Sequence, residues 1–528
     1  MSELREYIIT LINFEDLDDF YEDMETPGGN LYIPNRAIDV VHRREISRNT
    51  HYLLTDEEAE QIRQDPRVLA VELTPKDKGA IIKPLWTDNS NFWDKSSGNS
   101  NTHKNWALLR CIEGLQRNNW GSDGTATQTG TVQINAEGRN VDVVIMDGFI
   151  DPNHPEFAVN ADGTGGSRVV QYNWLQHATP SGTYQYGPYT GANNQHGIHV
   201  AGTVAGNTQG WARKANIYNM YVYGGDINPV NEDYFDYVRL WHNNKPINQT
   251  TGRKNPTIVN NSWGYEYTTN FDISSITKIT FRGVEYTSGL TSAFLTSCGL
   301  LNDGVYLYAI PFVSPSIEAD QEMAIDDGII IVGAAGNNSL KIDIDGGQDY
   351  NNSFTWGGST FFYHRGMSPT RGNQAICVGA ISTLANESKA TYSSCGPRID
   401  VYAPGSRIIS AMVGTGVSDS RNSSYFLLKY SGTSMASPQV SGVLACILET
   451  YPTMNQNQAL DYLIKTAKQN QITEVGSSFS DYAFLQGSPN RYLYFNKERQ
   501  DSGTTWPKLN YKPRPSSGRL YPRQRVRR

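Results

Sequence analysis

The sequence predicts an α/β protein whose main domain is a doubly wound parallel sheet flanked by helices. Short, continuous apolar runs recur along the chain, for example Val143–Ile145, Ile329–Val332 and Ala375–Ile381, as in strands that are buried on both faces. Stretches with helical spacing separate these runs, which is the alternation that a parallel sheet requires. The 528 residues exceed the length of a usual single domain, so we expect one large domain with appendages.

Composition and charge exclude several classes of protein. With 38% hydrophobic residues, the chain can bury a sizeable core and is not disordered overall. The net charge of -8 argues against a main domain that binds nucleic acid. No apolar run reaches the length of a membrane span, so we expect no membrane partner. The first residues lack the basic start and apolar middle of a signal peptide. This predicts a cytoplasmic or particle-associated protein, such as a virion component, rather than a classically secreted one.

Residues 1–85 predict a small α+β domain of ferredoxin-like type with its own core. Tyr7–Ile12 is typical of a strand. A helix should follow, because apolar residues recur at i, i+3, i+4 and i+7: Leu17, Phe20, Tyr21 and Met24. Thr55–Glu58 is a capping box that opens a second helix, and Val68–Glu72 is a closing strand.

The rest of the chain divides into a linker, a main domain and a tail. Residues 86–104 have the composition of an exposed linker. The main domain covers residues 105–490 and includes a stretch rich in Tyr, Ser and Thr at 265–312. That stretch is either an insertion that narrows access or contacts a partner, or a passive loop. Residues 491–528 are basic and proline-rich. We expect a flexible tail, with docking to an acidic surface or a larger assembly as the alternative.

Ser434 has the setting of a nucleophile. It lies within Ser431–Pro438, between small residues, where a helix starts that extends to about Tyr451. Small neighbours let a substrate backbone come close, and a helix N-terminus favours the negative charge that forms during attack. Taken alone, the segment also fits a capped helix without a catalytic role.

Two upstream segments supply the partners that such a serine needs. Val143–Gly148 is an apolar run with Asp147 near its end, as in a strand that carries an acid to the carboxyl edge of an α/β sheet. His196 opens a helix rich in glycine and alanine. Acid, histidine and serine follow in one of the chain orders known for Ser-His-Asp triads.

These motifs resemble those of the subtilisin-like serine proteases, the subtilase family, over residues 106–485. Gly432–Pro438 matches the family's Gly-Thr-Ser-Met-Ala-Ser-Pro without a change. His196–Gly202 resembles its His-Gly-Thr-His-Val-Ala-Gly, with Ile198 in place of the threonine. After the catalytic acid the family usually has Ser or Thr and then Gly, whereas this chain continues with Gly148 and Phe149.

The resemblance implies a serine endopeptidase that cleaves polypeptides through an acyl-enzyme, with Asp147, His196 and Ser434 as catalytic residues. The departures at Gly148 and Ile198 leave an alternative, a catalytically silent structural or binding protein of a larger particle that keeps the fold.

Further residues take roles through the same resemblance. Asn337 corresponds to the family's oxyanion asparagine, with Asn338 as the neighbour that competes for the role. Ser262, Trp263 and Gly264 resemble the strand edge that binds extended substrate, although the Trp263 side chain also fits ordinary core. His199 competes with His196, and we expect it to serve packing or hydrogen bonding instead.

The N-terminal domain resembles the subtilase propeptide, particularly over Leu54–Leu73. That implies a proenzyme whose own N-terminal domain acts as an intramolecular chaperone and inhibitor and is cut off between about Thr74 and Asn101. A generic ferredoxin-like accessory domain is the alternative.

No cofactor is required for this chemistry, and the cysteines do not have metal-ligand spacing. Subtilases often bind structural calcium, but the resemblance assigns no site; Asp162, Asp226 and Asp343 are among the loop acids available. The five cysteines form no CxxC pair, and we expect buried structural thiols.

Overall fold

The computed structural model describes residues 4–12, 16–33, 40–43, 49–73, 92–93, 105–113, 132–133, 136–174, 195–222, 234–267, 270–313, 315–371, 374–382 and 386–495. The chain forms two compact units, residues 1–89 and 90–528, and each is described on its own. Apart from residues 92–93, the predicted linker lies outside the described residues, as does the tail beyond residue 495.

The first unit is a four-stranded antiparallel sheet with two helices. Its elements follow in the order β1 (Arg5–Leu11), α1 (Leu17–Glu25), β2 (Val40–Arg43), β3 (Asn49–Leu54), α2 (Asp56–Ile62) and β4 (Val68–Leu73). The strand order β2-β3-β1-β4 is that of a ferredoxin-like βαββαβ unit. The Thr55–Glu58 capping box is present at the start of α2, with both of its hydrogen bonds formed. Ile9, Phe20, Met24 and Tyr52 are fully buried between sheet and helices, so this unit has a core of its own.

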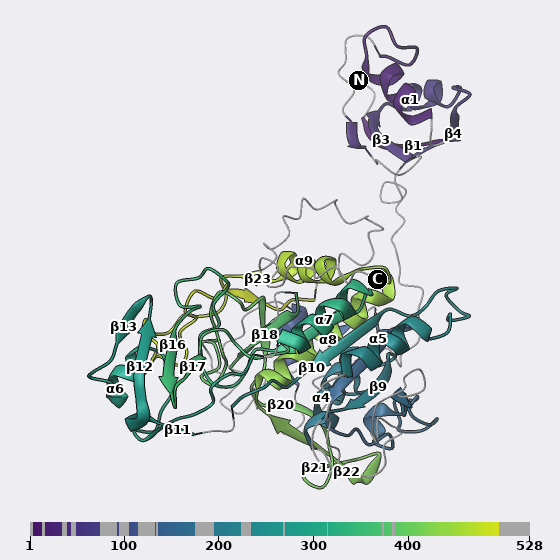
Figure 1. Ribbon diagram of the computed structural model, residues 1–528. Coiled ribbons are helices and arrows are strands. Elements are labelled where there is room, and N and C mark those ends of the chain that lie inside the picture. The colour runs from purple at the N-terminus through teal and green to yellow at the C-terminus, as the bar shows by residue number, and fades with distance from the viewer. Residues whose placement is uncertain are drawn as a thin grey trace, which may run out of the picture. The chain divides into compact units, whose positions relative to one another are not determined.

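A nine-stranded sheet is the centre of the second unit (Figure 1). Neighbouring strands are parallel, except that β23 is antiparallel to β24. In spatial order the strands are β23 (Lys468–Gln469), β24 (Arg491–Tyr492), β19 (Val401–Pro404), β18 (Ile376–Ile381), β15 (Ile330–Ala334), β10 (Thr257–Asn261), β7 (Asp142–Asp147), β9 (Asn216–Tyr221) and β8 (Val169–Val170).

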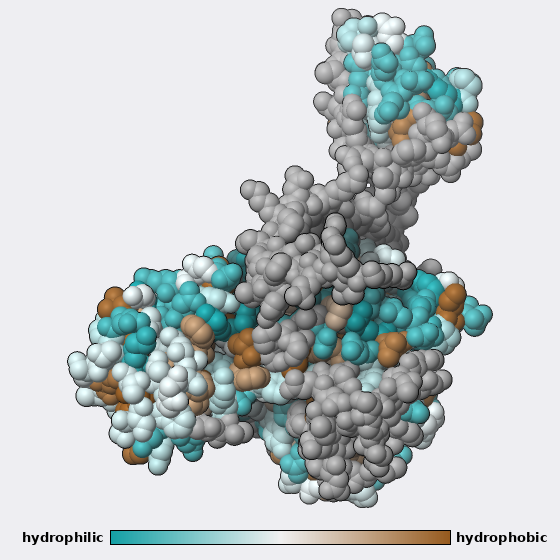
Figure 2. Space-filling model, viewed as in Figure 1, coloured by the Kyte–Doolittle hydropathy of each residue, from teal (hydrophilic) through white to brown (hydrophobic). Residues whose placement is uncertain are grey.

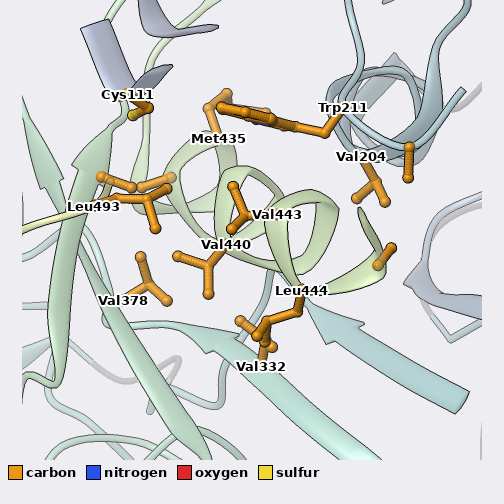
Figure 3. Close-up of a cluster of buried hydrophobic side chains, with 14 of the residues drawn as sticks. Cys111, Val204, Trp211, Val332, Val378, Met435, Val440, Val443, Leu444 and Leu493 are labelled. Atoms are coloured by element: carbon orange, nitrogen blue, oxygen red, sulfur yellow. The ribbon is translucent and has the colours of Figure 1, made fainter. Parts of the chain in front are cut away.

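Helices cover both faces of this sheet, as the predicted doubly wound architecture requires. On β7, Val143 and Ile145 belong to the core that contains α4 (Gln195–Ala205) and α8 (Thr433–Thr450). The alternate residues Val144 and Met146 belong to the core that contains α5 (Tyr234–Asn244) and α7 (Pro315–Asp326). Figure 3 shows the first core, where Val440, Val443 and Leu444 of α8 lie against strand side chains such as Val332 and Val378. Other elements of this unit are β5 (Phe92–Trp93), β6 (Val132–Gln133), α3 (Trp106–Glu113), a 3-10 turn η3 (Pro155–Phe157) and α9 (Gln456–Thr466).

The predicted insertion is a folded lobe rather than a passive loop. It contains β11 (Phe271–Asp272), a 3-10 turn η5 (Ile273–Ser275), β12 (Ile276–Phe281), β13 (Val284–Tyr286), α6 (Ser292–Ser297) and β14 (Tyr306–Leu307). The antiparallel sheet β13-β12-β16-β17 also takes in β16 (Ser353–Trp356) and β17 (Ser359–Phe362), which the sequence did not assign to the lobe. Phe271, Ile279, Leu295 and Phe354 form its core. The face of the lobe that is seen at the left of Figure 2 shows small apolar patches among polar residues.

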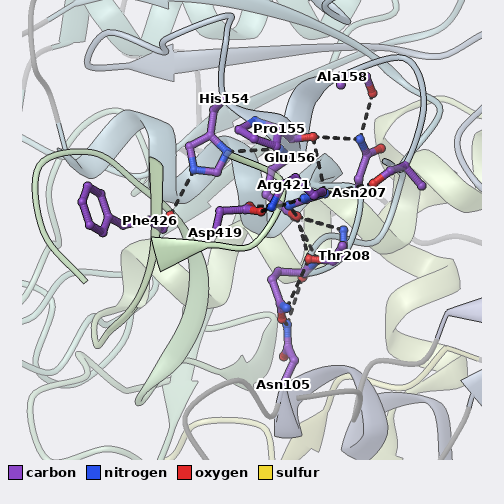
Figure 4. A network of polar contacts seen from close by, with 12 residues as sticks. Asn105, His154, Pro155, Glu156, Ala158, Asn207, Thr208, Asp419, Arg421 and Phe426 are labelled. Atoms are coloured by element: carbon purple, nitrogen blue, oxygen red, sulfur yellow. Dashed lines mark hydrogen bonds and ion pairs between the residues drawn. The ribbon is translucent and has the colours of Figure 1, made fainter. Parts of the chain in front are cut away.

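A second antiparallel sheet lies beside α4. It consists of β20 (Ile408–Met412), β22 (Asn422–Tyr430) and β21 (Val417–Asp419), in that order. A buried ionic network ties its β21–β22 turn to η3 (Figure 4). Arg421 donates from Nε to Asp419 (2.8 Å) and forms an ion pair with Glu156, which is fully buried.

Glu156 has further hydrogen-bond donors that hold its charge. The N–H groups of Thr208 and Gln209 donate to its Oε2 (3.0 Å each), just after α4 ends. Burial by itself would raise the pKa of Glu156, but Arg421 and Thr208 outweigh burial and lower the pKa to about 2. The carboxylate therefore stays charged and joins three separate segments of the chain.

We expect Glu156→Gln to destabilise the second unit by about 3 kcal/mol, because it leaves the half-buried Arg421 with less compensating charge. The folded pKa of Glu156 lies below its ordinary value of 4.5, so its stabilisation is present above that pH and is lost as the pH falls towards 2. Urea unfolding of both proteins at several pH values measures the difference. The exposed pair Lys278–Glu285 provides the control, and Glu285→Gln should change stability by less than about 1 kcal/mol. The role of Glu156 would be contradicted if Glu156→Gln lost no more stability than Glu285→Gln. It would also be contradicted if the difference in stability between wild type and Glu156→Gln did not become smaller in acid.

Candidate active site

The predicted catalytic residues gather at one edge of the sheet. Asp147 is the last residue of β7, and His196 and Ser434 are the second residues of α4 and α8. Parallel strands place their carboxyl ends at the same edge, and the helices that return to the sheet from that edge begin there. Ser262 directly follows β10, and Asn337 comes three residues after the end of β15. The site is therefore assembled from five elements that are far apart in the sequence.

Asp147 and His196 are joined by a hydrogen bond. The Nδ1–H of His196 donates to Oδ1 of Asp147 at 2.8 Å. Asp147 is fully buried, whereas the His196 side chain is 31% exposed and thus open to a substrate. The backbone N–H of Gly148, which stands where the family usually has Ser or Thr, also donates to Oδ1 (2.7 Å). Backbone thus supports the carboxylate at this position.

The close approach of α4 to the end of β7 makes this bond possible. A Cβ atom on Gly197 would lie 2.4 Å from the carbonyl oxygen of Gly148, which is closer than atoms pack. A larger residue at position 197 would push the first turn of α4, and His196 with it, away from Asp147. The glycine that follows His196 is therefore needed for packing.

The environment of His196 raises its pKa. Burial alone would lower it, but the negative charge of Asp147 and the hydrogen bond to it outweigh burial, so the pKa lies above its ordinary value of 6.5. A histidine with a raised pKa is a stronger base when it is neutral, which suits proton abstraction from a serine hydroxyl.

Ser434 is held against Ser262 by two hydrogen bonds. The Ser434 hydroxyl donates to the Ser262 carbonyl (2.9 Å), and the Ser262 hydroxyl donates to the Ser434 carbonyl (2.9 Å). Ser434 retains 8% exposure, so its oxygen is near the surface of the site. This reciprocal pair fixes the first turn of α8 to the end of β10. The sequence placed Ser262 beside the substrate and did not indicate that it positions the nucleophile.

Asn337 is exposed and its amide has a defined orientation. Its Oδ1 accepts hydrogen bonds from the N–H (2.9 Å) and the hydroxyl (3.0 Å) of Thr433. The Nδ2 hydrogens therefore point away from these two groups of Thr433. A Cβ atom on Gly432 would lie 3.4 Å from this Nδ2, so the amide nitrogen is beside the turn that carries Ser434. Asn338, the competing residue, donates instead to Glu266 (2.6 Å) and to the Ala309 carbonyl (3.2 Å). Thr433, which orients Asn337, was not singled out by the sequence although it lies inside the serine motif.

The three predicted substrate-binding residues lie directly beyond the last paired residue of β10. Ser262 is buried, and Gly264 lies close to Met367. Trp263 is half-buried, donates from Nε1 to the Met146 carbonyl (2.7 Å) and packs edge-on against Tyr234. The Trp263 side chain thus joins the core on the α5 face, which was the alternative interpretation of this residue.

His199 has the structural role that we expected. Its Nε2 lies 2.9 Å from the Ile408 carbonyl and 3.1 Å from the Leu428 carbonyl, and its ring stacks on Tyr430. Burial, its largest influence, lowers the pKa of His199 to about 3, so the ring is neutral. It therefore links α4 to the β20–β22 pair.

All five cysteines are buried thiols, as predicted. Of the candidate calcium ligands, Asp162 accepts from the Thr164 N–H (3.0 Å) and Asp343 from the Asp349 N–H (2.8 Å), whereas Asp226 lies outside the described residues. Within the described part of the chain, no group of three or more His, Cys, Asp or Glu side chains has the arrangement of a metal site. The helices described here include none that is long and apolar enough to cross a membrane.

A histidine paired with a buried carboxylate, beside a serine at a helix start, defines a candidate serine-nucleophile site on a doubly wound sheet. Residues 138–486 match the family described as the subtilase family, and the chain belongs to that family. The predicted family and the predicted class of serine endopeptidase are thereby confirmed.

Named relatives agree with this assignment. The extracellular serine proteinase of Thermus sp. (strain Rt41A) is 25% identical over 442 residues, which cover 83% of this chain and 73% of that protein. Subtilisin E of Bacillus subtilis (strain 168) is 26% identical over 347 residues, or 65% of this chain and 63% of the relative. The alkaline proteinase of Hapsidospora chrysogena is 25% identical over 368 residues, which cover 69% of this chain and 64% of that protein. The match thus spans less than two thirds of the length of these last two relatives.

Among solved structures, a cold adapted subtilisin-like serine proteinase matches 74% of this chain and 97% of its own, with 20% identity and a TM-score of 0.44. The arrangement of strands and helices described above is the direct evidence for the α/β fold.

The predicted location is wrong. We inferred a cytoplasmic or particle-associated protein from the first residues, whereas the Thermus relative is named an extracellular proteinase. The residues at the start of the chain are therefore no guide to where the protein acts.

We predict that kcat/KM rises with pH as His196 loses its proton, with a midpoint above 6.5 because Asp147 raises the pKa of His196. Asp147→Asn should lower that midpoint and reduce kcat about 10⁴-fold, since the amide no longer stabilises the imidazolium or its tautomer. Initial rates on a peptide substrate between pH 5 and pH 9 measure both effects. Asp151→Asn, a carboxylate change four residues away, is the control and should keep the wild-type midpoint. A midpoint at or below 6.5 in the wild type, or the same profile in both variants, would refute the assignment.

Proposed function

We propose that this chain is a serine endopeptidase that hydrolyses peptide bonds through Asp147, His196 and Ser434 by way of an acyl-enzyme. The observation that carries the proposal is the 2.8 Å hydrogen bond between Asp147 and His196 at the same sheet edge as Ser434. Helix α8 starts at Thr433, so the positive end of its dipole lies beside the oxygen of Ser434.

In the proposed reaction, Ser434 Oγ attacks the carbonyl carbon of the peptide bond while His196 Nε2 accepts the hydroxyl proton. The hydroxyl hydrogen points to the Ser262 carbonyl in this structure, so it turns about the Cβ–Oγ bond to reach His196. Asp147 keeps the proton on Nδ1 and stabilises the imidazolium. The C–N bond then breaks, and His196 returns the proton to the leaving amine. A water molecule attacks the acyl-enzyme in the same way, which releases the carboxylic acid and restores Ser434.

The negative charge on the carbonyl oxygen needs donors that are in place before the reaction. We assign this role to Asn337 Nδ2 and the N–H of Ser434, because Thr433 already fixes the Asn337 oxygen on the opposite side. A donor of this kind contributes about 3 kcal/mol to transition-state stabilisation. The reaction as proposed uses these side chains and water.

The substrate backbone would bind along Ser262–Gly264. These residues continue past Asn261, the last residue of β10 with sheet partners, so their backbone extends beyond the paired strands. An extended polypeptide that pairs with them would bring its carbonyl to Ser434.

We further propose that the chain is made as a proenzyme. The support is the compact unit of residues 1–89, which has its own core and directly precedes the protease domain in the sequence. In this proposal the unit is cut from the rest and acts as an inhibitor until it is degraded.

A fluorophosphonate probe tests both proposals, because it reacts with activated serines. Wild-type protein that is expressed from the full-length sequence should be labelled, and on a denaturing gel it should run as a shorter chain than Ser434→Ala. The Ser434→Ala protein should be unlabelled and full length. Ser441→Ala is the matched control; it removes another buried hydroxyl of α8, one that donates to Asn260, and should still be labelled.

The outcomes separate the two claims. Labelling without shortening would refute the proenzyme and leave the protease. A wild type that stays unlabelled even after limited digestion of residues 1–89 would refute the catalytic function itself.

A further inference from the structure

Two glycines lie close in the sequence to residues that are bonded to the first turn of α8. Gly264 is two residues after Ser262, which bonds to Ser434 in both directions. Gly336 directly precedes Asn337, and its N–H donates to the Thr433 hydroxyl (3.1 Å). Gly336 is therefore bonded to the first turn of α8, and Gly264 lies two residues from the serine that is bonded to Ser434.

The Met367 side chain fills the space between these glycines. A Cβ atom on Gly264 would lie 2.2 Å from the Met367 sulfur, and one on Gly336 would lie 2.8 Å from the Met367 methyl carbon. Met367 is only 6% exposed, yet it belongs to none of the four apolar cores of the described residues. Its burial thus comes from the walls of the active site rather than from a core.

Backbone hydrogen bonds hold Met367 in this place. The Ser368 N–H donates to the Phe312 carbonyl (3.1 Å), and the Tyr265 N–H donates to the Ser368 carbonyl (3.0 Å). The residue after Met367 is thereby paired with the residue after Gly264. These backbone bonds do not involve the Met367 side chain, so removing the thioether should leave open space between the two glycines without disturbing the backbone.

The position of Met367 bears on which peptide bond is cut. The carbonyl that Ser434 attacks must lie between Ser434 and Asn337, and the side chain next to that carbonyl must project towards the walls formed by the two glycines. Resting on the proposed function, we infer that Met367 is a specificity-determining residue, which limits the residue on the N-terminal side of the cleaved bond to small side chains such as Gly, Ala or Ser. Large aromatic side chains are excluded because the thioether already occupies their volume.

Peptide p-nitroanilides test this inference directly. Succinyl-Ala-Ala-Pro-Ala and succinyl-Ala-Ala-Pro-Phe p-nitroanilide differ only in the residue before the cleaved bond. We expect the wild type to prefer Ala, and Met367→Ala to raise the ratio of kcat/KM for Phe over Ala at least about tenfold. Met367→Leu keeps the volume and should keep the wild-type ratio.

A second methionine provides the control for packing. Met454 is also 6% exposed but belongs to the α8 core, so Met454→Ala creates a cavity away from the site. Met454→Ala should lose stability without a change in the ratio.

The result separates this inference from the proposed function. The role of Met367 would be overturned if the Phe-over-Ala ratio of kcat/KM in Met367→Ala were within about twofold of the wild type, or equal to that of Met454→Ala. The proposed protease function would still stand if the protein were active and reacted with the fluorophosphonate. A wild type that neither hydrolyses the Ala substrate nor reacts with the fluorophosphonate would overturn both.

Discussion

The contact between two backbones, Gly197 at the start of α4 and Gly148 at the end of β7, is the constraint on which the candidate site depends. It lets a helix and a strand approach until no side chain fits between them. At that separation His196 reaches Asp147 at 2.8 Å, and the buried carboxylate gains a cationic or hydrogen-bonding partner. A buried carboxylate without such partners is costly, so the geometry of catalysis and the stability of this edge are the same requirement.

Helix α8 is positioned by polar contacts and close packing together. Asn260 accepts hydrogen bonds from Ser437 (3.2 Å) and Ser441 (2.8 Å), which lie on the side of the helix that faces the sheet. A Cβ atom on Gly442 would lie 2.6 Å from Trp211, so the helix also touches a large aromatic ring across its backbone. Because these contacts come from several elements, the serine is held from more than one direction, which is how a site keeps its geometry to within a fraction of an ångström.

Much of the site could be predicted because its chemistry is local in the sequence. The residues around His196 and Ser434 include both the reactive group and the small neighbours that it needs, so one short segment indicates both the helix start and the role. Met367 could not be predicted in this way. Its place between Gly264 and Gly336 depends on three loops that meet only in the folded chain.

Contacts between distant parts of the chain also explain why the sequence did not indicate the full extent of the lobe. The stretch 265–312 was expected to be an insertion, but β16 pairs with β12 from about 75 residues away and β17 pairs with β16, and strand pairing over such a separation leaves no local pattern. The ferredoxin-like unit was predicted in outline from helical spacing and a capping box, whereas β2, a short strand of that sheet, was not. The prediction of location failed because it relied on the first residues of the chain, which carry no information about the protease domain.

The hydrogen bond between Asp147 and His196 is best tested by proton NMR. An imidazole N–H that is bonded to a buried carboxylate exchanges slowly and resonates far downfield of ordinary amides. We predict one such resonance in the wild type; it should persist in Ser434→Ala, because the bond does not involve the serine, and disappear in His196→Gln. A wild-type spectrum without this resonance, or one in which it survives the loss of His196, would contradict the account.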